Sequence, residues 1–415
     1  MLHARRTDLA LLSLSLAYFT LGVGSLAMIG LVQPMGRDLD ASPAAIANLV
    51  SVYALAFALW APASQVLLGH LPRRTVLLWG LAILSAASAL GAFLDNYWAI
   101  LATRVAMGLG GAMVGPMASA IGAGLVPPGQ QGRALSLVFS GMMLATVLGV
   151  PASAWLGALL GWRAVFLLIA LAGVAAAVAV HRLVADRSAG VRIGPGALLK
   201  VLRARRSGLS VATTLLQMAA QFATYALIAP FLTERMGASP DWIAPMLLVF
   251  GVGGIAGNIL AGRLSDRIGA DRTVGVSLWS VALVFAVLAV APAAIGIALP
   301  LMLLWAVAGT LFQAPQQQRL VQIDPAARGL LLASNAAALY LGMAAGSFLA
   351  GVTHHALGAS ALPLVSVALL GAAWWAFQAS RASAGSDTAG SDTTGGDTTG
   401  GDTTGGDSGT ETRRA

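Results

Sequence analysis

Long apolar runs separated by short polar segments dominate this chain. Each run is about as long as the roughly 20 residues that a helix needs to cross a bilayer, or longer. The spans expected from this pattern are residues 9–32, 44–69, 75–94, 98–126, 134–158, 163–184, 208–233, 242–264, 273–292, 297–320, 329–355 and 361–379. All should be α-helices, because lipid offers no hydrogen-bond partner to an unpaired backbone group. The sequence therefore predicts an all-α membrane protein with twelve transmembrane helices.

Composition supports this prediction and narrows the function. Of 415 residues, 58% are hydrophobic and 10% are charged, whereas soluble domains carry about 25% charged residues. The chain has no cysteine, which excludes disulfides, thiolate metal sites and cysteine nucleophiles. It also lacks a nucleotide-binding phosphate loop and the common hydrolase motifs. We therefore expect no enzyme activity, cofactor or metal, although a membrane-embedded enzyme or scaffold stays as a third alternative.

The positive charges lie mostly on one side of the expected membrane, and the net charge is +8. With the N-terminus inside, the outer loops hold Arg37, Arg163 and Arg235. The inner loops hold Arg5, Arg6, Arg73, Arg74, Arg133, Arg182, Arg187, Arg192, Lys200, Arg203, Arg205, Arg206, Arg263, Arg267, Arg272, Arg319 and Arg328. Because cytoplasmic loops are enriched in Lys and Arg, both termini should be cytoplasmic in a cell (inner) membrane protein. A nucleic-acid partner is not expected.

The chain divides into two expected halves of six helices each. Residues 1–184 form the first half, 185–207 a basic cytoplasmic linker, 208–380 the second half, and 381–415 a disordered tail that repeats Thr-Thr-Gly-Gly-Asp. An internal repeat supports this division: Gly-x-Leu followed by Arg-Thr-Val occurs over 69–76 and again over 262–274. Two halves with matching landmarks are typical of transporters built from structural repeats.

Arg104 is the only charged residue between Tyr97 and Pro116, within the fourth expected span. A charge at this depth costs about 2.5–3.5 kcal/mol on insertion scales, so it marks a functional-site hypothesis. The alternative is that its side chain reaches an interface. Since no Asp or Glu lies deep in an expected span, we expect backbone carbonyls or side-chain oxygens to balance the charge.

Small and polar residues form stripes on several expected spans. Gly141, Ala145, Gly149, Ser153 and Gly157 recur at every fourth position of span five, which permits close helix approach. This face could serve packing alone, or it could be the interface along which the halves slide. Pro151 should kink the same helix. On span seven, Thr214, Gln217, Gln221 and Tyr225 share one face. The candidate cavity residues are Ser25, Tyr53, Gln217, Gln221, Tyr225, Gln313 and Asn335, although each alone could simply bond a neighbouring helix.

Three motifs resemble those of the major facilitator superfamily. The segment with Gly262, Asp266, Arg267, Gly269 and Arg272 resembles the family's gating loop between paired helices. Arg104-x-x-x-Gly108 resembles a motif linked to proton transfer, and the segment containing Gly149 and Pro151 is similar to the antiporter motif. The runs 161–166 and 229–234 resemble the drug- and metabolite-efflux branch. Two departures stand out: the first loop copy has Pro72 and no aspartate, and Ser25 stands where relatives often carry a glutamate.

The resemblance implies a secondary transporter that exports a small neutral or lipophilic solute by alternating access, with proton antiport. The absence of a deep acidic residue favours the alternative, an uncoupled facilitator on the same fold. The expected partners are the solute, protons and the lipid bilayer, and we expect a monomer. His354 and His355 are expected to be interfacial residues without a functional role.

Overall fold

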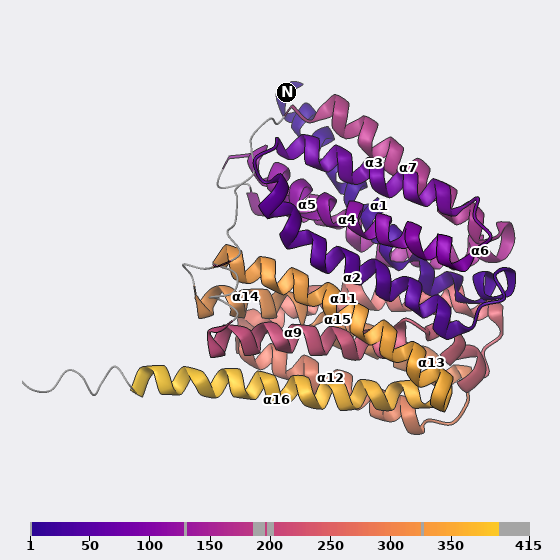
Figure 1. Ribbon diagram of the computed structural model, residues 1–415. Coiled ribbons are helices and arrows are strands. Elements are labelled where there is room, and N and C mark those ends of the chain that lie inside the picture. Colours follow the sequence, from indigo (N-terminus) through magenta and orange to yellow (C-terminus); the bar gives the residue numbers. More distant parts are fainter. Residues whose placement is uncertain (1, 128–130, 186–195, 197–202, 325–327, 390–415) are drawn as a thin grey trace, which may run out of the picture.

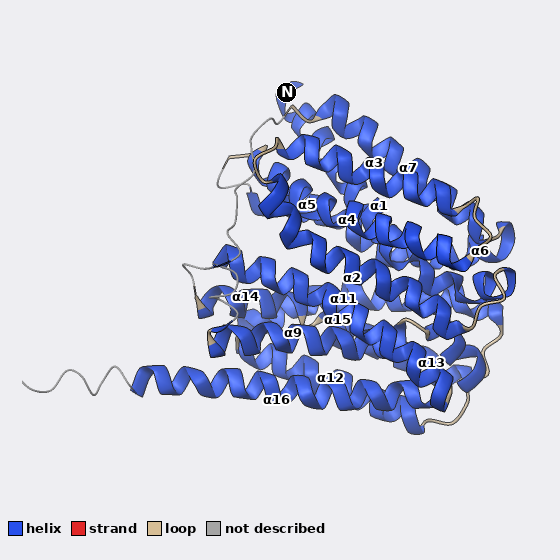
Figure 2. Ribbon diagram, viewed as in Figure 1, coloured by secondary structure: helices blue, strands red, loops and turns tan. Residues whose placement is uncertain are grey.

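The computed structural model describes residues 2–127, 131–185, 196, 203–324 and 328–389, and the elements in these ranges are helices (Figures 1 and 2). The first half contains α1 (Leu2–Asp38), α2 (Pro43–Leu68), α3 (Arg73–Gly91), α4 (Tyr97–Gly124), α5 (Gln131–Leu144), η2 (Ala145–Gly149), α6 (Val150–Leu160) and α7 (Trp162–Leu183). The second half contains α9 (Arg205–Tyr225), α10 (Ile228–Pro230), η3 (Phe231–Arg235), η4 (Pro240–Trp242), α11 (Ile243–Ile268), α12 (Ala270–Val290), α13 (Ile295–Thr310), α14 (Gln313–Ile323), α15 (Arg328–Leu357), η5 (Ala359–Ala361) and α16 (Leu362–Ala389).

The membrane-spanning helices confirm the predicted fold class. Within the described ranges, 11 helices are long and apolar enough to cross a membrane, and the pair Arg205–Tyr225 and Ile228–Arg235, bent by 50°, supplies a twelfth span. In Figure 1, the first-half helices form an upper group and the second-half helices form a lower group. The protein is therefore an integral, multi-pass, all-helical membrane protein.

Several boundaries differ from those that hydropathy predicts. Span five is interrupted by the π-helical turn η2, which ends two residues before Pro151 and stands where a kink was expected. Helix α9 begins at Arg205, inside the range expected to be linker, and most of 185–207 lies outside the described residues. Helix α16 continues to Ala389, beyond the expected tail start at 381, because no proline interrupts this alanine-containing segment. The remainder of the expected tail, 390–415, lies outside the described residues.

The glycine stripes show matching packing in the two halves. A Cβ on Gly141, in span five, would lie 1.9 Å from the Ser15 carbonyl oxygen on α1. A Cβ on Gly346, in span eleven, would lie 2.3 Å from the Ala219 carbonyl oxygen on α9. In each half, therefore, the fifth helix packs its backbone directly against the first. This is the arrangement expected of two pseudo-symmetric repeats.

Of the two readings of the span-five stripe, the structure shows packing within the first half. A Cβ on Gly149 would lie 2.4 Å from Val23 Cγ2 on α1, within the same half. A different face of span five meets the second half, where a Cβ on Gly251 of α11 would lie 2.6 Å from the Val147 Cα. The stripe permits close approach, as predicted, but sequence spacing does not identify which neighbour approaches.

Several contacts join the two halves at one end of the molecule. The basic end of the molecule carries Arg73, Arg182 and Arg267 at the termini of α3, α7 and α11. We call the other end, where these contacts lie, the opposite end. At the opposite end, Gln33 Nε2 donates a hydrogen bond to Thr233 Oγ1 at 3.3 Å. Farther toward the middle, the rings of Phe57 on α2 and Tyr340 on α15 stack with centroids 3.5 Å apart. The halves thus meet closely from the middle to the opposite end.

Candidate functional site

Arg104 is completely buried and bonds to backbone carbonyl oxygens of two neighbouring helices. Its Nη1 donates to the Gly24 oxygen at 2.6 Å and its Nη2 to the Ser25 oxygen at 3.4 Å, both on α1. Its Nε donates to the Leu49 oxygen on α2 at 3.2 Å. The expected bonding partners are confirmed, and the alternative of an interfacial side chain is excluded. Arg104 therefore connects α4 to α1 and α2.

Tyr53 and two glycines complete the surroundings of Arg104. The guanidinium carbon lies 4.5 Å from the centroid of the buried Tyr53 ring, in a cation–π geometry. A Cβ on Gly108 would lie 2.4 Å from the Tyr53 carbonyl oxygen, and a Cβ on Gly111 would lie 2.5 Å from its hydroxyl oxygen. The glycines of the α4 motif thus provide the space for Tyr53. Its hydroxyl has no hydrogen-bond partner.

Ser25 contributes to this site through its backbone. Its carbonyl accepts a hydrogen bond from Arg104, while its own hydroxyl donates to the Gly22 oxygen at 3.2 Å. The side chain is buried, with 1% exposure. A serine here cannot take up a proton, so any titrating role for this position is absent from this chain.

Trp305 occupies the corresponding place in the second half. It precedes Gly309 by the same spacing that separates Arg104 from Gly108. Its buried Nε1 donates to Gln221 Oε1 on α9, the first helix of that half, as Arg104 donates to α1. Sequence reasoning missed this residue, although the shared spacing to a glycine was the available signal. An indole replaces a guanidinium, so the second half makes the same interhelical connection without a charge.

The predicted polar face of span seven is present, and it divides into two environments. Gln221 and Tyr225 lie in an aromatic cluster, in which Tyr225 stacks on Phe250 with centroids 4.6 Å apart and contacts Trp305 edge-on at 5.8 Å. Gln217, which is 1% exposed, has no partner for either amide atom. The structure therefore brings Gln221 and Tyr225 together and leaves Gln217 with unused hydrogen-bonding capacity.

The other end of this face belongs to a buried polar network on α9, α14 and α15. Thr214 donates to Asn335 Oδ1 at 2.7 Å, and Gln316 Nε2 donates to Thr214 Oγ1 at 3.1 Å. Asn335 therefore bonds a neighbouring helix, which is the alternative that the sequence left open for each of these candidate cavity residues. Gln313, one helical turn before Gln316, donates to Met218 Sδ at 3.3 Å. Sequence reasoning missed Gln316, since a glutamine in a polar run carries no burial signal.

Arg319 was expected in an inner loop, and this placement is wrong. It lies on α14 with 4% exposure, and its Nε donates to Asp271 Oδ1 at 2.6 Å. Its Nη2 donates to Ser380 Oγ on α16 at 2.8 Å, while Nη1 has no partner. Among the described residues, Arg104 and Arg319 are the buried charged side chains. Each half thus carries one, but only Arg319 has a carboxylate partner.

The expected gating loop lies at the basic end, between α11 and α12. Gly262, Asp266 and Arg267 are exposed on the last turns of α11, and Arg272 is exposed in the first turn of α12. Gly269 joins the two helices with a φ of 86°, a conformation that favours glycine. The structure shows where these residues lie, and their gating role stays a prediction.

His354 has a partner that the sequence did not reveal. Its Nε2 lies 3.0 Å from a carboxylate oxygen of Glu234, which joins α15 to η3 at the opposite end.

Within the described part of the chain, no group of three or more His, Cys, Asp or Glu side chains could hold a metal ion.

The relationship to known proteins follows from three comparisons. A family model described as Major Facilitator Superfamily matches residues 14–347. The chain belongs to the Major Facilitator Superfamily. It is 32% identical to the inner membrane transport protein YdhP of Escherichia coli (strain K12) over 365 residues, which covers 88% of this chain and 93% of that relative.

Two further likenesses extend this result. The chain is 35% identical to the chloramphenicol resistance protein of Streptomyces lividans over 263 residues, covering 62% of this chain and 67% of the relative. The fold matches a bacterial homologue of the human lysosomal transporter Spinster with a TM-score of 0.71, at 18% identity, covering 91% and 97% of the two chains. The protein is therefore a membrane transporter of this superfamily and not an enzyme.

Proposed function

We propose that this superfamily member exports a small neutral or lipophilic solute by alternating access, coupled to proton antiport. The supporting observation is the cluster formed by Gln221, Tyr225, Phe250 and Trp305, with the unpaired amide of Gln217 on the same helix. Small-molecule sites are lined mainly by apolar and aromatic side chains with a few placed polar groups. Aromatic faces and uncharged amides suit an uncharged amphiphile better than an anion.

The proposal assigns a conformational role to the contacts between the halves. In this proposal the protein lies in the cell (inner) membrane. Its basic end, both termini and the linker at 185–207 face the cytoplasm. The contacts at the opposite end, such as that between Gln33 and Thr233, then close the outward path. They must separate once in every transport cycle. The protein works as a monomer in this account, because both halves belong to one chain.

A second candidate is an uncoupled facilitator, and one observation favours it. Among the described residues both buried charged side chains are arginines, so a buried carboxylate that could bind and release a proton is missing from this set. Proton antiport then depends on groups nearer the membrane surfaces. The half-exposed Asp271 beside Arg319 is one such group, and Glu234 beside His354 is another.

Flux through proteoliposomes containing the purified protein separates these alternatives. The panel should contain chloramphenicol, for which one relative is named, and neutral, cationic and anionic solutes of similar size. We expect flux of neutral or lipophilic solutes that increases when the imposed pH gradient has one sign and decreases when it is reversed. Equal flux in both gradients would establish the facilitator. Flux confined to charged solutes would refute the proposed substrate class.

A further inference from the structure

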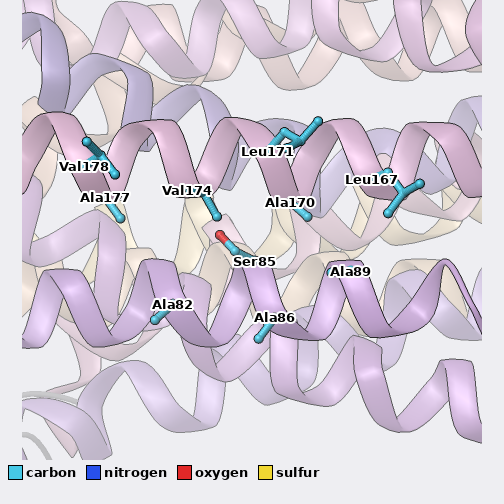
Figure 3. Close-up of a pocket in the computed structure, with 10 residues that line it drawn as sticks. All are labelled: Ala82, Ser85, Ala86, Ala89, Leu167, Ala170, Leu171, Val174, Ala177 and Val178. Atoms are coloured by element: carbon cyan, nitrogen blue, oxygen red, sulfur yellow. The ribbon is translucent and has the colours of Figure 1, made fainter.

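Helices α3 and α7 form a groove at the edge of the first half that lies farthest from the second half in Figure 1. The groove has a volume of about 560 Å³ and is lined by side chains of these two helices (Figure 3). Both helices are membrane spans, so the groove faces lipid. Its volume lies within the range of about 300–1,000 Å³ that is typical of ligand sites.

The shape of the groove follows from side-chain size. Ala82 and Ala86 on α3 leave space, while Leu171 and Val174 on α7 are more than half exposed and form the opposite wall. The helices cannot close this space by shifting sideways, because the Ser85 side chain of α3 already lies against the α7 backbone at Gly173. Ser85 Oγ lies 2.1 Å from where a Cβ on Gly173 would stand. The groove is therefore preformed.

A hydrogen bond at each end keeps the two helices in register. Toward the opposite end, Ser88 Oγ donates to the Phe166 carbonyl oxygen at 2.8 Å. At the basic end, Arg74 Nη2 donates to the His181 carbonyl oxygen. Arg74 Nε is buried there without a partner.

Positive charge gathers at the basic end of these two helices, beyond the groove. Arg73 and Arg74 open α3, and the exposed Arg182 lies in the last turn of α7. At about 1.5 Å per residue, α3 rises roughly 16 Å from Arg74 to Ser85. This is about half of the roughly 30 Å hydrocarbon core, or one lipid leaflet. A lipid phosphate at these arginines would therefore extend its acyl chain to the level of the groove.

We propose that this groove holds an acyl chain of an anionic phospholipid whose phosphate binds Arg73, Arg74 and Arg182. Basic residues between membrane helices are a recurring recognition site for anionic headgroups. Bulk lipid could also fill the apolar groove, and arginines are common on the cytoplasmic side of membrane proteins. A preference for an anionic headgroup is therefore what distinguishes the proposed site, which fits a lipid with a negative headgroup and an acyl chain that reaches the groove.

Native mass spectrometry of the purified full chain tests this proposal by titrating phosphatidylglycerol against phosphatidylcholine of the same chain length. We expect phosphatidylglycerol to bind more tightly, and Arg182→Gln to weaken its binding about fivefold, since each basic residue near the surface contributes about 1 kcal/mol. Ala86→Leu should weaken both lipids by filling the groove. Arg263→Gln, another exposed arginine at the basic end, and Ala372→Leu, on the exposed face of α16, are the controls.

Three results would overturn the proposal. Equal affinity for the two lipids would remove the headgroup site. An equal loss in Arg263→Gln and Arg182→Gln would show a general charge effect. Unchanged binding in Ala86→Leu would remove the acyl chain from the groove. The thermal unfolding of each variant, measured without added lipid, confirms that the compared proteins are folded.

Discussion

Substitution of Arg104 by Lys and by Met should lower the stability of both variants but separate them in transport. The guanidinium donates to the carbonyl oxygens of Gly24, Ser25 and Leu49 through three different nitrogens. A lysine keeps the charge but presents its donors from a single nitrogen. It therefore cannot reach carbonyls on both α1 and α2. A methionine has similar length and no charge.

The magnitudes follow from these contacts. A hydrogen bond to a charged group contributes about 1.5–3 kcal/mol, so the loss of two of three bonds in Arg104→Lys costs about 3–6 kcal/mol while a buried charge remains. Arg104→Met loses all three bonds, about 4.5–9 kcal/mol by the same measure, and the interaction with Tyr53, worth about 2 kcal/mol when desolvated. It also removes the insertion cost of about 2.5–3.5 kcal/mol, so its net loss is about 3–8.5 kcal/mol. The two losses overlap, and both variants should be less stable than the wild type.

Two measurements on the same preparations check this. Thermal unfolding of the purified proteins should rank wild type above both variants. Solute flux in proteoliposomes should rank wild type above Arg104→Lys, with Arg104→Met inactive, because we expect the charge to take part in transport. If Arg104→Lys unfolded at the wild-type temperature, the hydrogen bonds to the carbonyls would not be stabilising. Full transport by Arg104→Met would remove Arg104 from the mechanism.

Three further predictions concern packing, polarity and topology. Gly149→Leu should lower the unfolding temperature and transport, because the leucine overlaps Val23 at a cost of at least about 1–3 kcal/mol. The control Gly371→Leu, with no atom within 4 Å of its Cβ, should change neither. Equal effects of the two substitutions would contradict the close contact. Gln217→Leu should stabilise the protein by about 1–3 kcal/mol, since both amide atoms are buried and unpaired, while reducing flux; unchanged flux would show that the substrate does not bind there. Gly196→Cys should react with an impermeant thiol reagent in inside-out vesicles but not in intact cells, and the reverse pattern would refute the assigned topology.

Hydropathy predicted the twelve spans because crossing a bilayer imposes one requirement on every helix. Hydropathy alone did not predict the turn η2 or the bend between α9 and α10, although Pro151 predicted a kink close to η2. The charge of Arg104 predicted its carbonyl partners because lipid offers no alternative. The burial of Arg319 was not predicted, since it stands at the end of the expected span 297–320, in a glutamine-rich segment that carries no burial signal.

The glycine stripes show a second limit of sequence reasoning. The spacing of Gly149 and its neighbours predicted a close helix contact, and the contact exists. Spacing does not say which helix approaches, however, and α1 of the same half takes that place. The halves meet instead through Val147 and the opposite-end contacts. Such partner choices are properties of the assembled bundle.

Cross-linking the two halves at the opposite end tests alternating access most directly. The chain has no native cysteine, so Gln33→Cys and Thr233→Cys, placed at side chains whose polar atoms lie 3.3 Å apart, can be joined by a short, reducible thiol-specific reagent. Proteoliposome flux should stop on cross-linking and return on reduction, and each single-cysteine variant should be unaffected. Undiminished flux through fully cross-linked protein would contradict the account, because the path would then not depend on separation of the halves.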